Sequence, residues 1–473
     1  MEKFGSFTDF ALERVKIYPN SGGDPVDITT LINTFHYVES LNMPFLSGSM
    51  EVVDSGGLLQ GLPIQGAEKV EVEVKTNASE ELTKYTLVIW RVANRYVQNQ
   101  KQVYAIGLVS VEALTNEVTR VQERLEGNPT DITQKLLQDK LKTDKPFNKE
   151  KSLLQMKLIP NNRRPFDLIS SMAVKSISPK AKIDQQGSSS NEEASEAESV
   201  KGSSGFFFWE NKRGYNYYSV DSLCADDNSD LKNKDLDLPP WGPYVEKMGN
   251  QSDGADDRFV IYQSIFSSEV DLLSSLRKGK YSSFITFFNH STGQYEEFQY
   301  KIQQSYDSMA HLGGQESISK VPANEIELSE KPSKRISMIL DHETWYNDPG
   351  IASPDPDDGS DSPTEFADWQ MHFAAQSIAR YQLLKNQQCT LVIPGNPEIC
   401  AGDKIDILLL SKLSNKEQKE EQFDSETSGI YLIEEVTHTY DTTTGTNGRF
   451  TTTLRLMRDS YGKKDKQSKH GTK

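Results

Sequence analysis

Two short stretches of this sequence place metal-ligating side chains near one another. The first is His342-Glu343, but the second histidine that a zinc protease helix needs, three residues after the glutamate, is absent. The second is the loop 354–365, in which Gly359 and Glu365 are spaced as in a calcium-binding loop. Prolines, however, stand at two positions where that loop needs oxygen ligands. We therefore predict no metal site.

The motifs of common catalytic and cofactor sites do not occur either. There is no Gly-x-Ser-x-Gly, no phosphate-binding loop and no dinucleotide fingerprint. Carboxylates are so plentiful that their presence is no evidence for glycoside hydrolysis. The cysteines are odd in number and lack metal-ligand spacing, so they indicate neither disulfides nor zinc: Cys224, Cys389 and Cys400. We predict no catalytic residue, no cofactor and no enzymatic activity.

The composition narrows the class of protein further. The chain has 473 residues, enough for about three domains. With 69 acidic against 52 basic residues its formal charge is -17, which argues against wrapping nucleic acid or binding an anionic membrane surface. Much of the acidic excess falls in two loops, 184–204 and 345–368. No signal peptide and no membrane span are predicted, because no apolar run is long enough.

The elements that would have to position any site are mainly strands. In KVEVEV the valines at 70, 72 and 74 alternate with Glu71 and Glu73, which is typical of a strand with one buried and one wet face. Similar patterns predict a first β domain that closes near residue 113. Four more strands are predicted at the end of the chain, in TLVIP, KIDILLL, GIYLIEEVTHTY and RFTTTLRLMR.

Between these β regions the sequence predicts a few packing helices. One covers about 131–141 with Asp131 as its N-cap, and another begins at Pro165. A third begins at the capping pattern 268–271 and stops at Gly279, and a fourth runs from Trp369 to about Lys385. The fold class is therefore mainly β with a few packing helices.

A β-hairpin is predicted in GFFFWENKRGYNYYSVDSLC, residues 205–224. Aromatic residues favour strands, and the polar tetrapeptide 211–214 ends in a glycine that supplies the positive φ of a hairpin turn. A weak internal echo is also present, since the segment 66–72 is similar to the segment 402–407. Each has a glycine followed by an acid, a lysine and alternating aliphatic and acidic residues. The echo suggests duplication.

An ordered set of motifs adds what single residues cannot. The run VDITTLINTFHYVESLNMPFLSGSMEVVDSGGLLQGLPIQGAEKVEVEV resembles the opening domain of baseplate central hub proteins from contractile-tailed bacteriophages. RRPFDLISSMA, the aromatic hairpin and LLSSLRKGKYSSFITFF are similar to the middle of these proteins. LVIPGNPEICAGDKIDI, SGIYLIEEVTHTY and TTLRLMRDSYG are similar to their end, so the resemblance covers about residues 6–462.

The resemblance implies a structural role and a domain plan. Such hubs are homotrimers whose subunits each contribute two tube-like β-barrels, so that a trimeric central spike meets a hexameric tail tube. It implies a first barrel at 1–113 and a second at 205–254 and 369–460. An intermediate α+β region would take 114–204 and 255–345. Three additions would be a disordered loop at 184–204, an acidic loop at 346–368 and a flexible tail at 461–473.

Partners and location follow from the same resemblance. The expected partners are two further copies of the chain, the central spike, the tail tube protein, baseplate wedge proteins, the tape measure protein and DNA in transit only. The expected location is the virion tail baseplate, assembled in the host cytoplasm. A balanced or acidic channel wall does not retain DNA. The wet strand face with Glu68, Glu71 and Glu73 points either to the channel or to the exterior, and we predict that at least some of these candidate channel-facing residues line the channel.

Two alternatives stay open. The first is the hub of a related contractile injection machine, such as a tailocin or a type VI secretion spike (VgrG). Against the secretion spike, the sequence ends soon after RDSYG, without a needle domain. The second alternative is a tail-associated peptidoglycan hydrolase. It would need a lysozyme-like insertion of well over a hundred residues, and the longest unassigned loop is far shorter.

Overall fold

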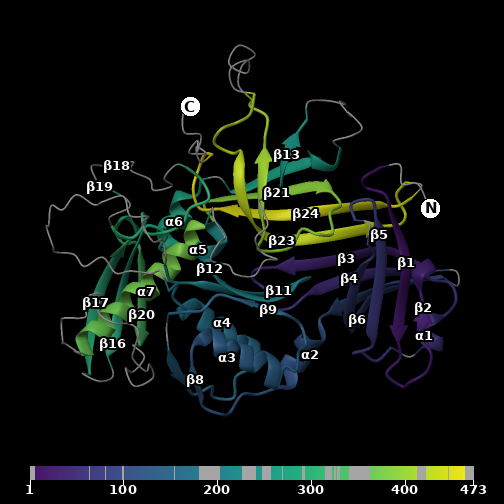
Figure 1. The fold of residues 1–473 in the computed structure, drawn as a ribbon, viewed down its shortest axis with the longest axis horizontal. Coiled ribbons are helices and arrows are strands. Elements are labelled where there is room, and N and C mark those ends of the chain that lie inside the picture. The colour runs from purple at the N-terminus through teal and green to yellow at the C-terminus, as the bar shows by residue number, and fades with distance from the viewer. Residues whose placement is uncertain are drawn as a thin grey trace, which may run out of the picture.

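The computed structural model confirms a mainly β chain with a few helices (Figure 1). The structure describes residues 6–62, 64–79, 81–98, 101–153, 155–179, 203–225, 241–247, 257–268, 270–289, 293–314, 322–323, 326–327, 331–339, 363–412, 422–445 and 447–463. The loop 184–202, most of the acidic loop, the stretch with His342-Glu343 and the tail from 464 lie outside these residues.

One 14-stranded sheet dominates the fold. All its pairings are antiparallel except those that β13 makes with β14 and β22. Its strands are β1 (Phe10–Tyr18), β2 (Val26–Asp27), β3 (Ile32–Ser40), β4 (Ser47–Asp54), β5 (Lys69–Thr76), β6 (Thr83–Gln98), β7 (Lys101–Val109), β13 (Trp241–Glu246), β14 (Val260–Ile261), β15 (Gln263–Ser268), β21 (Gln387–Pro394), β22 (Lys404–Leu408), β23 (Gly429–Asp441) and β24 (Arg449–Arg458).

The large sheet encloses two separate hydrophobic cores. Strands β1 to β7 turn one face of each strand into the first core, as Val70, Val72 and Val74 of β5 illustrate. Strands β21 to β24 line the second core together with Trp209 and Tyr218. Because side chains alternate along a strand, the opposite faces carry the polar residues. The predicted alternation of KVEVEV is confirmed.

A smaller α+β region packs beside the large sheet around a third core. Its strands are β8 (Leu125–Gly127), β9 (Phe147–Lys149), β10 (Met156–Leu158), β11 (Phe206–Asn211) and β12 (Gly214–Ser219). Its helices are α2 (Val111–Val118), α3 (Pro129–Lys135), the π-helical turn η2 (Leu136–Lys140), α4 (Pro165–Lys175) and α5 (Val220–Cys224). Helix α4 begins at Pro165 as predicted.

A three-stranded sheet and the longest helix form the remaining part of the described fold (Figure 1). The sheet has the order β17-β16-β20 and packs against α7 around a fourth core. These elements are β16 (Ser282–Asn289), β17 (Gln294–Lys301), β20 (Lys334–Ile339) and α7 (Pro363–Leu383). Short elements complete the set: α1 (Leu58–Gly61), α6 (Leu272–Lys278), β18 (Pro322–Ala323), β19 (Ile326–Glu327) and the 3-10 turns η1 (Thr29–Leu31), η3 (Asp257–Phe259) and η4 (Ile302–Gln304).

Two predicted helix starts were wrong in their capping residue. Asn128, not Asp131, caps α3, because its side chain accepts a hydrogen bond from the N–H of Thr130. Asp271, not Ser268, caps α6 by accepting from the N–H of Ser274. In both cases a second residue with a capping side chain stands nearby, and the tertiary packing selects between them. The predicted stop at Gly279 is confirmed, with φ at 81°.

The aromatic hairpin exists, but its place in the domain plan was wrong. β11 and β12 pair in register from Phe206↔Ser219 to Asn211↔Gly214. In the described residues they bond to β9 and to no strand of the large sheet. The reason is that both faces of the hairpin are buried, with Phe208 and Tyr217 in the third core and Trp209 in the second. The hairpin is a layer between two cores.

Other boundaries of the domain plan also move. Strands β14 and β15, expected in the intermediate region, belong to the large sheet. Ser203 and Ser204, expected at the end of a disordered loop, are buried, and Ser204 donates to the carbonyl of Phe373. Helix α7 begins at Pro363, inside the stretch expected as an acidic loop. The division into two barrels stays a prediction.

Candidate assembly surface

Two parts of the large sheet repeat the same five-strand unit. The first unit has the order β3-β4-β7-β6-β5 and the second has the order β15-β21-β24-β23-β22, both antiparallel throughout. The pairing Lys69↔Val88 in the first corresponds to Lys404↔Leu432 in the second. One step later both units have a bulge, after Ile89 and after Ile433. Matching order, register and bulge make the two units topologically equivalent.

The equivalent turns before β5 and before β22 confirm the similarity between the two segments, but with the glycines displaced by one residue. The N–H of Ala67 donates to the carbonyl of Ile89 at 2.6 Å, and the N–H of Gly402 donates to that of Ile433 at 3.0 Å. Both residues have positive φ, 66° and 92°. Gly402 therefore corresponds to Ala67 and not to Gly66. The two acids that follow, Glu68 and Asp403, are both buried.

The two units join edge to edge within the chain. Strand β23 has β24 along one edge, and the other edge is shared by β22 and β3. The β3 pairing runs from Ser40↔Glu435 to Thr34↔Asp441. Across it Phe35 stacks on Tyr440, with ring centroids 5.7 Å apart, and Tyr37 stacks on His438 at 6.0 Å. Cross-strand aromatic pairs of this kind stabilise a sheet beyond their backbone bonds.

A buried carboxylate ties three segments together at this junction. Glu39 of β3 accepts hydrogen bonds from the N–H of Lys212 at 2.6 Å, the N–H of Ala401 at 2.9 Å and the hydroxyl of Tyr37 at 3.0 Å. Burial raises the pKa of Glu39 to about 7, against the effect of these donors. The next residue of the hairpin turn, Arg213, pairs with Asp403 at 2.7 Å. The polar tetrapeptide thus links both units, a role that the sequence pattern did not reveal.

The three candidate channel-facing acids do not share one face. Glu68 is 2% exposed, and its carboxylate accepts from the N–H groups of Gln65 and Gly66, so its role is to hold a turn. The prediction placed Glu68 on the wet face of the strand. This was wrong, because Glu68 precedes β5 and lies on the buried side. Glu71 and Glu73 do lie on the half-exposed face of β5.

The two remaining acids are closely paired with cations. Glu71 contacts Lys69 at 2.6 Å and accepts from the hydroxyl of Tyr18. Glu73 contacts Lys84 at 2.9 Å and Arg14 at 3.9 Å. These hydrogen bonds lower the pKa of both carboxyl groups. The face is therefore a mosaic of both charges, and it does not locate a channel.

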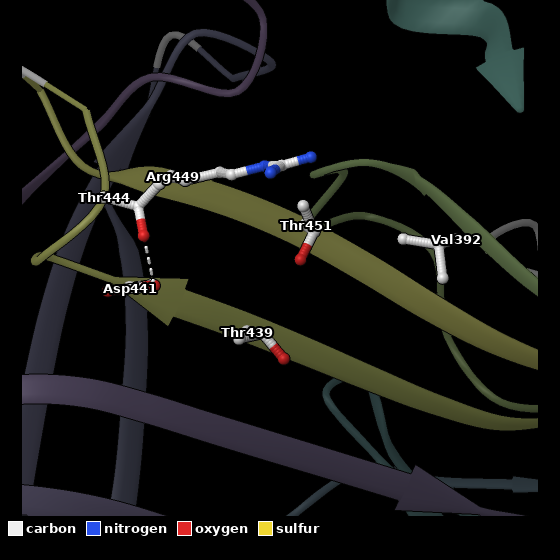
Figure 2. A pocket seen from close by; sticks show the side chains of 6 residues that line it. All are labelled: Val392, Thr439, Asp441, Thr444, Arg449 and Thr451. Carbon is white, nitrogen blue, oxygen red and sulfur yellow. Dashed lines mark hydrogen bonds between the residues drawn. The ribbon is translucent and has the colours of Figure 1, made fainter. Parts of the chain in front are cut away.

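A shallow depression lies on the second unit (Figure 2). Its lining comes from β21, β23, β24 and the turn between the last two: Val392, Thr439, Asp441, Thr444, Arg449 and Thr451. Asp441 accepts hydrogen bonds from the hydroxyls of Thr443 and Thr444, which lower its pKa although burial opposes them. With its only carboxylate engaged by its own turn, the depression has the character of an ordinary wet sheet surface.

The described residues contain no arrangement typical of catalysis or metal binding. They hold no group of three or more His, Cys, Asp or Glu side chains placed to bind a metal ion. All three cysteines are buried, and burial raises the pKa of Cys224 to about 12, so its nucleophilic thiolate form is suppressed. No helix in this part of the chain combines the length and the apolar character that crossing a bilayer requires.

Comparison with known proteins identifies the class of fold. The chain shares its fold with a tail protein from Neisseria meningitidis MC58, with a TM-score of 0.51, 11% sequence identity and coverage of 95% of this chain and 97% of that one. A prophage MuSo2 43 kDa tail protein from Shewanella oneidensis is also similar, with a TM-score of 0.48, 8% sequence identity and coverage of 94% of this chain and 98% of that one. For a chain of a Francisella PdpA–VgrG complex the TM-score is 0.42 and the sequence identity 9%, with coverage of 97% of this chain and 54% of that one.

The fold assignment rests on the Neisseria protein. Its similarity extends over nearly the full length of both chains, so it concerns the arrangement of the whole molecule and not one motif. No family model and no curated protein matches the sequence. The chain is thus a β structure with the fold of a tail protein.

Proposed function

We propose that this protein is the structural hub of a contractile phage tail baseplate. Three copies would form an adapter between a trimeric central spike and a hexameric tail tube, and would enclose part of the channel for genome delivery. The observation that carries the proposal is the repeated five-strand unit. A chain that presents two equivalent units can offer six of them from three copies, which matches a threefold partner on one side and a sixfold partner on the other.

Two further observations support a structural role. The fold is that of a tail protein over almost its whole length. Buried polar groups such as Glu39 join segments that are far apart in the sequence. The homotrimer, the spike and tube partners, the wedge and tape measure contacts and the virion location belong to this proposal.

The mass of the purified protein in solution tests the adapter directly. One chain has a mass of 53.3 kDa, and we expect sedimentation or light scattering to give three times this value at micromolar concentration. A particle that stays monomeric up to about 100 μM would overturn the trimeric adapter, since obligate homo-oligomers persist at such concentrations.

Two alternative functions have their own tests. The hub of a tailocin or of a type VI-like machine predicts the same trimer, and copurification with a sheath and tube but without a genome-filled head would identify it. A tail-associated peptidoglycan hydrolase predicts release of soluble fragments from purified cell walls. We expect no release above that of a heat-inactivated sample.

The proposed channel wall can be tested at Glu71 and Glu73. Replacing both by Gln keeps their size but leaves Lys69, Lys84 and Arg14 without their anionic partners. If this face lines the channel, the basic wall should retain DNA and slow genome delivery, more at low than at high ionic strength. Unchanged delivery kinetics in assembled virions would place the face elsewhere.

A further inference from the structure

The junction inside the chain is a template for a junction between chains. At the junction inside the chain, β3 of the first unit pairs with the second half of β23, residues 435–441, which we call its distal half. This pairing lies along the edge of β23 opposite β24. Figure 1 shows β24, β23, β3 and β4 running side by side across the molecule. One unit therefore recognises the other by adding a strand to an open edge, which satisfies backbone groups that would otherwise be unpaired.

The first unit has the same edge without an occupant. Strand β6 corresponds to β23, and β5 pairs with its first half, from Thr83 to Val88. In the described part of the chain no strand pairs with the second half, from Arg91 to Gln98, on the edge opposite β7. Large apolar side chains are exposed in this stretch, with Tyr96 at 60% and Val97 at 58%, and Trp90 immediately before it is 51% exposed.

The second unit has a strand that corresponds to β3 and is also open. Strand β15 pairs with β21 as β3 pairs with β4. Among the residues described, its other edge pairs with no strand. Ile265 in the middle of this strand is 50% exposed. The strands β15-β21-β24-β23-β3-β4-β7-β6 thus follow one another in one sheet, and its two ends are the two open edges.

We infer that the distal half of β6 in one copy pairs antiparallel with β15 of the next copy. This inference rests on the proposed adapter and names the surface that assembles it. The occupant is a second copy of the chain, because the chain itself carries both the edge and a strand equivalent to the one that fills the matching edge at its internal junction. A long exposed edge with apolar side chains is otherwise an aggregation hazard.

The template also fixes the register of the pairing. At the internal junction Thr439 lies opposite His36. Tyr96 takes the place of Thr439, because it pairs with Val103 of β7 as Thr439 pairs with Thr451 of β24. Ile265 takes the place of His36 by the same comparison of β15 with β3. Tyr96 of one copy should therefore lie opposite Ile265 of its neighbour.

A cysteine pair tests this register in the full-length protein. The double variant Tyr96→Cys with Ile265→Cys should form disulfide-linked dimers and trimers under mild oxidation, seen on a non-reducing gel. The native cysteines are buried and do not interfere. Tyr96→Cys combined with Tyr295→Cys is the control, since Tyr295 is 73% exposed on the separate sheet of β16, β17 and β20. This control should stay unlinked.

A charge exchange provides a second, non-covalent test. Ile265→Lys alone and Tyr96→Glu alone should each weaken trimer formation at least tenfold, because each places an unpaired charge in the strand interface. The double variant places opposite charges across the interface and should recover most of the lost association. Tyr295→Lys should leave association unchanged. Since Ile265, Tyr96 and Tyr295 are exposed in the single chain, circular dichroism should show all variants folded.

The outcomes separate this inference from the adapter itself. A trimer without a Tyr96–Ile265 link and without charge rescue would overturn the strand pairing and leave the adapter standing. Links that build open filaments and never closed trimers would support the pairing and overturn the adapter. A monomer at all concentrations would overturn both. Linking of this chain to a different protein, and not to itself, would also overturn the inference.

Discussion

At the residue scale, the most consequential group in the described structure is a buried arginine. Arg380 of α7 is fully buried and bonds Asp459 at 2.8 Å, Asp221 at 3.1 Å and the carbonyl of Ala310 at 2.5 Å. Asp459 lies just after β24, Asp221 lies in α5, and Ala310 lies near the end of the described segment 293–314. One guanidinium therefore ties α7 to three segments that are far away in sequence.

Removing this arginine should be costly. We expect Arg380→Met to lower the free energy of unfolding by about 3–5 kcal/mol, because two carboxylates would remain buried without their cation. Urea unfolding followed by circular dichroism would measure the loss. Arg455→Met is the control, since Arg455 is about half exposed and its pairs with Glu434 and Glu435 are long. It should cost less than about 1 kcal/mol.

Asp459 should make the protein sensitive to acid. Burial opposes its ionisation, but the hydrogen bond with His311 and the charge of Arg380 outweigh burial and hold the pKa of Asp459 far below its usual range. A carboxyl with a lowered folded pKa stabilises the fold above its unfolded pKa, about 4, and loses this contribution as the pH falls below that value. The Asp459→Asn variant should therefore have a lower free energy of unfolding than the wild type at pH 7. Between pH 4 and 2 its free energy of unfolding should fall less steeply than that of the wild type. Asp167→Asn, at a half-exposed surface pair, should keep the wild-type slope.

At the scale of elements, the equivalent turns before β5 and β22 differ in what fills the space beside them. A Cβ on Gly402 would stand 2.5 Å from Cζ2 of Trp209, and its φ of 92° disfavours any side chain. Ala67 occupies the same place in the first unit with φ at 66°. Trp209 of the hairpin packs against the second turn, which makes glycine necessary there.

Exchanging the residue types should show this difference. Gly402→Ala should cost about 2–4 kcal/mol, since backbone strain and overpacking act together. Ala67→Gly should be neutral or stabilise by up to about 1 kcal/mol, because relief of the left-handed strain is offset by added chain entropy. Thermal unfolding of the two variants would check both signs. Equal effects would mean that Trp209 does not constrain the second turn.

At the scale of the whole molecule, the internal junction should make the two units unfold together. Tyr440 and Phe450 come from β23 and β24 but belong to the core of the first unit. Tyr440 stacks on Phe450 at 4.2 Å and bonds the hydroxyl of Tyr85 at 2.7 Å. Hydrogen exchange should accordingly show equal protection of β4 and β21, as expected for a cooperative unit.

Breaking the junction should separate the two units. We expect Tyr440→Ala to cost about 3–5 kcal/mol and to lower the protection of β4 more than that of β21. Tyr300→Ala, in the core beneath α7, removes a side chain of the same size away from the junction. It should destabilise the protein while β4 and β21 stay equally protected. Uncoupling by both variants would contradict a special role for Tyr440.

The sequence by itself determined the local structure of this protein. Alternation in KVEVEV, the proline at 165 and the glycine at 279 act over a few residues, so they specified a strand, a helix start and a helix stop without reference to the rest of the chain. The motif order also indicated the fold class, and the echo between 66–72 and 402–407 indicated a repeat to within one residue.

Only the tertiary structure decided which elements meet. The hairpin 206–219 reads as a strand pair in any context, and its place between two cores depends on neighbours up to about two hundred residues away, such as Ala401. The burial of Glu68, the joining role of Glu39 and the open edges of β6 and β15 have the same origin. Pairing along a sheet edge is set by long-range register, and no local pattern encodes which edge remains free.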